Sequence, residues 1–213
     1  MEAAVLAKKS PAQSEKIHLL VEGVEVQALR SPMSDEEFED FCYQNPDLRI
    51  EQDKQGNIII MSPVSYDSGN QESEVNADIV FWNRKYKLGK TFSPSTMFLL
   101  PDGEKRMPDA AWVSMEKHEK LSRRERKKFA RIVPDFIVEV RSPSDDPKVL
   151  KDKIAKVWIA NGVRLAWLID PVEQAAFVFR PGTEPIEIKG FNHRLSGEEV
   201  LPGFQFDLSI LKE

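Results

Sequence analysis

The segment PDFIVEVRSPS, residues 134–144, constrains the fold most strongly, because Glu139 and Arg141 fall among its apolar residues. Its short length, its β-branched residues and the prolines near both ends predict a buried β-strand. Side chains alternate across a strand, so we expect Ile137, Glu139 and Arg141 on one face. A buried, unpaired carboxylate costs several kcal/mol. Glu139 is therefore expected to face a solvated cleft, to bind a cation or to form a structural pair with Arg141.

A second acid has a similar setting in RMPDAAWVS, residues 106–114. Asp109 follows a proline and begins a short apolar segment that is typical of a strand. Aspartate after proline is also common in turns, so a purely structural role is the alternative. Two carboxylates on neighbouring strands would form an all-oxygen site suited to Mg²⁺ or Mn²⁺, which can hold a phosphate and activate water.

A third acid, Glu74, lies in the segment QESEVNADIVFWNRKYK, residues 71–87. Val75, Ile79 and Trp82 form an apolar stripe at helical spacing, which predicts a long helix. Such a helix, packed on the sheet, could direct Glu74 toward the same cleft. Glu72 lies within one turn and competes for this role, and a solvated helix face is the alternative for either acid.

The whole chain predicts one α/β or α+β domain with a mixed β-sheet flanked by helices. Its 213 residues are 41% hydrophobic and 31% charged, which is typical of a globular protein. We expect an N-terminal arm over residues 1–33 and a single domain over 34–213. Within it we expect a capped helix from Ser34, an additional N-terminal β-hairpin over 48–63, a helix over 148–160 and further C-terminal strands.

Several classes of protein are disfavoured by the residues present. Cys42 is the single cysteine, the start of the chain does not resemble a signal peptide, and no apolar run could span a membrane. We therefore expect a cytoplasmic protein. The three histidines are dispersed and no glycine-rich loop precedes a helix, which argues against zinc, thiol catalysis and a nucleotide cofactor. The tryptophans lie in apolar patterns and are expected in the core rather than in base stacking: Trp82, Trp112, Trp158 and Trp167.

The net charge of −5 is unfavourable for a protein that binds nucleic acid. One stretch is nevertheless strongly basic, and it could contact phosphates or could be a solvated surface. The basic block comprises Arg123, Arg124, Arg126, Lys127, Lys128 and Arg131.

Three segments together resemble a known family: GNQESEV, LLPDGEKRMPDAAWVS and PDFIVEVRSPSDDPKVLKDKIAKVWIANGVRLAWLIDP. They are similar to the Uma-type family of "putative restriction endonucleases" in the PD-(D/E)xK nuclease superfamily, roughly from Ser34 to Leu211. The resemblance implies a restriction-endonuclease-like fold and Mg²⁺- or Mn²⁺-dependent hydrolysis of phosphodiester bonds, with DNA as substrate. It implies Asp109 and Glu139 as metal ligands and Glu74 as the helix acid. The Val140 carbonyl is well placed to complete the oxygen shell.

The chain departs from the superfamily pattern at Arg141, where a lysine would follow Glu139. Arginine does not deprotonate in proteins, although it can hold a phosphate. The resemblance implies that the next helix supplies the lysine, which would be Lys153, with Lys156 as the alternative. A homodimer is a further expectation, since enzymes that cut both DNA strands often act as two-fold dimers. The alternatives are an inactive nuclease-fold module that binds nucleic acid or a protein, and a subunit that works only with a partner.

Overall fold

The computed structural model describes residues 16–21, 24–29 and 33–212. It divides into two compact units, residues 1–62 and 63–213. The expectation of one domain that begins at Ser34 stays a prediction.

The first unit contains two antiparallel hairpins and a short helix. In α1 the Ser34 hydroxyl accepts from the Glu37 amide, and the Glu37 carboxylate accepts from the Ser34 amide, so the expected capped start is confirmed. The predicted 48–63 hairpin is also confirmed, and its turn adopts a positive φ at Gly56. The elements are β1 (Lys16–Val21), β2 (Val24–Leu29), α1 (Asp35–Gln44), β3 (Arg49–Gln52) and β4 (Ile58–Met61).

The second unit is built on a mixed, six-stranded sheet of order β12-β11-β10-β9-β8-β5. β9 and β10 run parallel, and the other neighbours in this sheet run antiparallel. Its strands are β5 (Gly89–Phe92), β8 (Ala110–Ser114), β9 (Phe136–Val140), β10 (Leu165–Asp170), β11 (Ala175–Phe179) and β12 (Ile186–Lys189). Two further strand pairs are β6 (Phe98–Leu99) with β7 (Lys105–Arg106) and β13 (Arg194–Ser196) with β14 (Gln205–Asp207).

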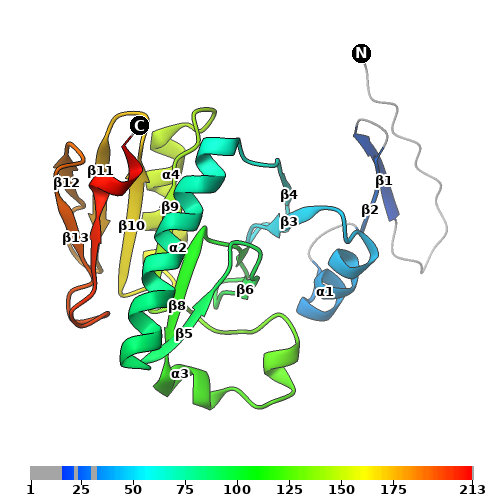
Figure 1. The fold of residues 1–213 in the computed structure, drawn as a ribbon. Coiled ribbons are helices and arrows are strands. Elements are labelled where there is room, and N and C mark those ends of the chain that lie inside the picture. Colours follow the sequence, from blue (N-terminus) through cyan, green and yellow to red (C-terminus); the bar gives the residue numbers. More distant parts are fainter. Residues whose placement is uncertain (1–15, 22–23, 30–32, 213) are drawn as a thin grey trace. The chain divides into compact units, whose positions relative to one another are not determined.

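Helices lie on both faces of this sheet, and each side has its own hydrophobic core (Figure 1). On one face α2 (Tyr66–Tyr86) packs with the C-terminal hairpin; residues in this core include Val75, Ile79, Trp82, Trp112, Phe136, Val138, Trp167 and Phe206. On the other face lie α4 (Pro147–Lys153) and the π-helix η2 (Ile154–Ile159); this core includes Val113, Ile137, Ile154, Trp158, Ala166 and Leu168. The strand alternation predicted for residues 134–144 thus places Ile137 on the α4 side.

Three details differ from the sequence-based expectation. Helix α2 begins at Tyr66, before the predicted start, because the Ser65 hydroxyl caps it by accepting from the Ser68 amide. The predicted 148–160 helix changes at Ile154 from α-helical to π-helical hydrogen bonding. A short helix, α3 (Met115–Lys120), and the 3₁₀ turns η1 (Glu125–Lys127) and η3 (Leu208–Leu211) were not expected.

All four tryptophans are buried, as predicted. Among the described residues, no helix is both long enough and apolar enough to cross a membrane.

Candidate active site

Asp109 lies immediately before β8 and is bonded to the end of β9. Its Oδ2 accepts a hydrogen bond of 2.7 Å from the amide of Val140, the residue after Glu139. β8 and β9 pair antiparallel with Ala110 opposite Val138, so this bond lies just beyond their pairing, at the C-terminal end of β9. Two predicted acids, Asp109 and Glu139, therefore belong to one corner of the second unit.

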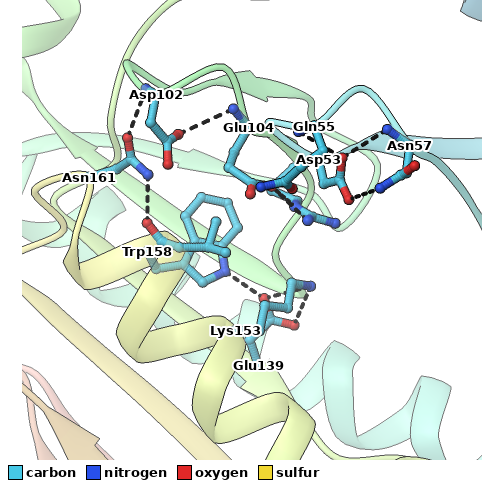
Figure 2. Close-up of polar contacts among 11 residues, drawn as sticks. Asp53, Gln55, Asn57, Asp102, Glu104, Glu139, Lys153, Trp158 and Asn161 are labelled. Carbon is cyan, nitrogen blue, oxygen red and sulfur yellow. Dashed lines mark hydrogen bonds and ion pairs between the residues drawn. The ribbon is translucent and has the colours of Figure 1, made fainter. Parts of the chain in front are cut away.

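Glu139 is the acid within strand β9, and only 4% of the residue is exposed. Its carboxylate contacts two side chains from the following helical segment, as Figure 2 shows. Oε1 lies 3.0 Å from the Lys153 Nζ and accepts a 2.7 Å hydrogen bond from the Trp158 Nε1. Lys153 also donates to Oε2 at 3.2 Å. The helix lysine implied by the family resemblance thus lies against Glu139.

Glu72 of α2 is the third carboxylate in this corner. It is buried, and its negative charge raises the pKa of Asp109. Asn76, one turn later in α2, donates from Nδ2 to the Asp109 carbonyl at 2.8 Å and to the Glu72 carbonyl at 2.9 Å. At the start of the helix, the Ser142 hydroxyl donates to that of Ser68 at 3.2 Å. These bonds hold α2 on both sides of Glu72.

The pKa of Asp109 stands well above its ordinary value. Desolvation by the surrounding protein is the largest cause, and the negative charges of Glu139 and Glu72 add to it. The Val140 amide and the Lys153 ammonium act in the opposite direction, but they do not outweigh the burial.

Glu74 occupies a different side of α2 from Glu72. Residues two positions apart in an α-helix, such as Glu72 and Glu74, differ in direction by roughly 200° around the helix axis. The two acids therefore cannot face the same way. Glu72 shares the buried stripe with Val75, whereas Glu74 is half-buried and raises the pKa of Asp78 through its charge. The structure therefore brings Glu72, and not Glu74, to Asp109. The signal was present in the sequence, because Glu72 lies at i−3 from Val75 and i−7 from Ile79.

Arg141 does not take the lysine position. Its Nη1 donates to both carboxylate oxygens of Asp170 at the end of β10, at 2.9 and 3.1 Å. Its Nε donates to the Asp145 carbonyl at 3.1 Å, which closes the loop after β9. Arg141 thus forms a structural ion pair with Asp170. The pair between Arg141 and Glu139, which the sequence allowed, is not the one that the structure shows.

Lys156, the alternative lysine, is exposed and pairs with Asp152 at 3.0 Å. Residues 123–128 of the basic block, with Arg123, Arg124, Lys127 and Lys128, are exposed on the segment between α3 and β9. Within it, Arg126 bonds the ring of His118 at 3.0 Å. The surface is accessible, and nothing in its contacts assigns it a ligand.

A hollow of about 350 Å³ opens beside Glu72. Its walls come from one side of α2 and from the end of β5, and they include Ser73, Asn76, Thr91 and Phe92. The acid corner therefore borders a space that a substrate group can enter.

The donor set fits a hard divalent cation in its chemistry, because Asp109, Glu139 and Glu72 offer carboxylate oxygens that repel one another. Within the described part of the chain, no three acidic, histidine or cysteine side chains are arranged as a ready-made metal site. The Glu139 carboxylate is occupied by Lys153 and Trp158 instead. A cation at Glu139 would therefore compete with Lys153 for the carboxylate oxygens.

A family model with the description "Uma2: Putative restriction endonuclease" matches residues 35–209. The chain belongs to the Uma2 family. This confirms the resemblance seen in the sequence, and it places the three acids within the matched residues of a Uma2 protein. No curated protein matches the chain.

Solved structures resemble the Uma2 chain as well. One is a crystal structure from Anabaena variabilis described as "a putative nuclease belonging to DUF820". It is 21% identical, the match covers 84% of this chain and 97% of the other, and the TM-score is 0.68. This similarity confirms the predicted fold class, a mixed sheet flanked by helices.

The structure adds to the sequence analysis at two residues. The family resemblance implies Glu74 as the helix acid, whereas the competing Glu72 lies on the buried stripe of α2. Trp158 was expected only in the core, and it does lie there, but its indole nitrogen also bonds Glu139. No sequence signal distinguishes a tryptophan that only packs from one that also bonds an acid.

Proposed function

We propose that this Uma2 protein is a metal-dependent endonuclease that hydrolyses phosphodiester bonds in DNA. The observation that carries the proposal is the hydrogen bond from the Val140 amide to Asp109, which places Asp109 beside Glu139, with the Lys153 ammonium 3.0 Å from Glu139. Asn76 joins α2 to the same place, because it bonds the carbonyls of both Glu72 and Asp109. Acids from a helix and from two neighbouring strands, beside a lysine, are the parts that such a reaction needs.

Each residue has a distinct role in this proposal. Asp109, Glu139 and the Val140 carbonyl would hold Mg²⁺ or Mn²⁺, and Glu72 would bind it directly or through water in place of Glu74. The bound cation supplies a Lewis acid and a water of lowered pKa. Lys153 would orient the attacking water or stabilise the negative charge that grows on the phosphoryl oxygens.

The reaction is a displacement at phosphorus. The water oxygen bonds to phosphorus and gives its proton to solvent, while the bond to the leaving oxygen breaks and that oxygen takes up a proton. Glu72, whose helix borders the hollow of about 350 Å³, would face the side from which the DNA strand enters.

DNA binding would use the basic block at residues 123–131, whose exposed cations compensate locally for the net charge of −5. Arg141 is left out of this role because Asp170 holds its guanidinium. A two-fold homodimer would place two such sites on opposite strands, and the cytoplasm would supply both DNA and Mg²⁺.

The competing function is a non-catalytic module on the same fold that binds nucleic acid or protein. The ion pair between Lys153 and Glu139 favours it, because a satisfied polar network needs no cation. Mn²⁺ calorimetry together with cleavage of plasmid DNA distinguishes the two. The nuclease binds Mn²⁺ and cuts DNA, and Asp109→Asn and Glu139→Gln abolish both while the protein stays folded. A wild-type protein that binds no Mn²⁺ and leaves DNA intact would favour the module.

A further inference from the structure

Trp158 makes a polar contact that its place in the core does not require. The side chain is fully buried among apolar residues on the α4 side of the sheet. Its indole nitrogen nevertheless donates a 2.7 Å hydrogen bond to Oε1 of Glu139, nineteen residues earlier in the chain. This length is at the short end of the range for N–H···O bonds.

Lys153 and Trp158 reach the same carboxylate although they are five residues apart. On an α-helix, residues at this spacing point roughly 140° away from each other. The segment from Ile154 to Ile159 is a π-helix, and the Ala160 amide bonds the Ala155 carbonyl five residues back at 3.2 Å. This wider turn lets both side chains meet Glu139, which is consistent with the frequent location of π-helical turns at functional sites.

The two contacts differ in what they can do during a reaction. The indole is a neutral donor that neither accepts nor loses a proton, and the packing around Trp158 fixes its ring. Lys153 carries a full charge on a flexible chain, and its side chain is 16% exposed. When another positive charge balances Glu139, Lys153 is free to turn toward substrate, whereas Trp158 stays in place.

We propose that Trp158, placed by the π-helical turn, is a positioning residue that fixes the Glu139 carboxylate so that Lys153 can leave it. The inference rests on the proposed nuclease function, because it assigns Glu139 to a cation and Lys153 to the reaction. Residues that orient a ligand to a metal typically change metal affinity by about 10- to 100-fold when they are replaced.

Trp167 provides a matched control. It is also fully buried, but on the α2 side of the sheet, and its indole nitrogen has no hydrogen-bond partner within the described residues. Trp158→Phe and Trp167→Phe remove the same group from comparable apolar surroundings. Only the first also removes a bond to Glu139.

The experiment compares wild-type protein, Trp158→Phe, Trp167→Phe and Glu139→Gln by three measurements. These are the indole N–H signals in ¹⁵N-labelled protein, Mn²⁺ affinity by calorimetry, and kcat and KM for a duplex DNA substrate. We expect the Trp158 indole signal to move in Glu139→Gln and on addition of Mg²⁺, while the Trp167 signal stays in place. Trp158→Phe should lose at least tenfold in Mn²⁺ affinity and should lower kcat more than it raises KM. Trp167→Phe should change neither.

Failure of this inference and failure of the nuclease function give different results. Equal Mn²⁺ affinity in wild type and Trp158→Phe, with DNA cleavage intact, would overturn the positioning role and leave the function standing. A wild type without Mn²⁺ binding or cleavage would refute the function. Should Trp158→Phe not fold, the Glu139→Gln spectrum still decides, since an unmoved Trp158 indole signal refutes the bond.

Discussion

The Nζ of Lys153 lies 3.0 Å from Oε1 of Glu139, so a lysine from the helix faces the acid that the strand presents. The loop after β9 leads directly into α4, and this brings the last turn of α4 back over the strand. Arg141, directly after β9, stands where the sequence resemblance would place a lysine, and its guanidinium pairs with Asp170 instead. The positive charge at Glu139 therefore comes from a different element.

We expect Lys153→Ala to lower kcat by at least 100-fold, because a group that orients water or stabilises developing charge typically contributes 10²- to 10⁴-fold. Lys156→Ala is the control, since Lys156 is 71% exposed and pairs with Asp152 one turn away. Single-turnover cleavage of a labelled duplex measures both. Equal cleavage rates in the two variants would show that Lys153 has no role in the reaction.

The sequence indicated the positions of the strand acids more clearly than those of the helix residues. Glu139 could be recognised because an acid within an apolar strand must have a partner, and Asp109 because it begins the neighbouring strand. The choice between Glu72 and Glu74 depends on the phase of α2, which spacing from Val75 and Ile79 could have fixed. The π-helical turn could not be foreseen, because its residues also satisfy an α-helical pattern. The partner of Arg141 depends on strand order, which brings Asp170 of β10 beside β9.

The assignment of the helix acid predicts opposite results for two neighbouring glutamates. Glu72→Gln should weaken Mn²⁺ binding by at least tenfold, because Glu72 is buried beside Asp109. Glu74→Gln should bind Mn²⁺ as wild type does, since the charge of Glu74 acts on Asp78 instead. Calorimetry on both variants provides the test. If Glu74→Gln lost Mn²⁺ affinity and Glu72→Gln kept it, Glu74 would be the helix acid, as the resemblance implies, and the assignment of Glu72 would be wrong.

The raised pKa of Asp109 predicts how stability depends on pH. Its folded-state pKa exceeds the unfolded value, so its contribution is fully present below about pH 3.9 and is lost as pH rises through the folded-state pKa. Asp109→Asn removes this pH-dependent loss of stability, and the new amide oxygen can still accept the hydrogen bond from the Val140 N–H. Without divalent cations, the variant should therefore be more stable than wild type at pH 7 by on the order of 1 kcal/mol. The difference should vanish near pH 3, as followed by urea unfolding. Greater stability of wild type at pH 7 would contradict this.

Arg141→Ala should destabilise the protein by about 3 kcal/mol, because it leaves the Asp170 carboxylate, 3% exposed, without its cation. Arg194→Ala, which breaks the exposed pair with Asp207, should destabilise the protein far less, because solvent screens that pair. Urea unfolding compares the two. The folded fraction of Arg141→Ala should keep wild-type Mn²⁺ affinity, and a loss of affinity would give Arg141 a role in the site.

Neutralising the basic block should weaken DNA binding and flatten its dependence on salt. The combined variant replaces Arg123, Arg124, Lys127 and Lys128 with glutamine, and all four side chains are exposed, so folding should be unaffected. Each phosphate contact contributes roughly 0.9 to the slope of log affinity against log salt for duplex DNA, because binding releases condensed counterions. Fluorescence anisotropy in Ca²⁺, at salt from about 50 to 200 mM, measures the slope without cleavage. As control, glutamine at Lys85, Lys87, Lys156 and Lys189 removes the same charge from exposed positions outside the block. A slope that falls equally in both variants would show only the effect of net charge, and an unchanged slope would make the block a solvated surface.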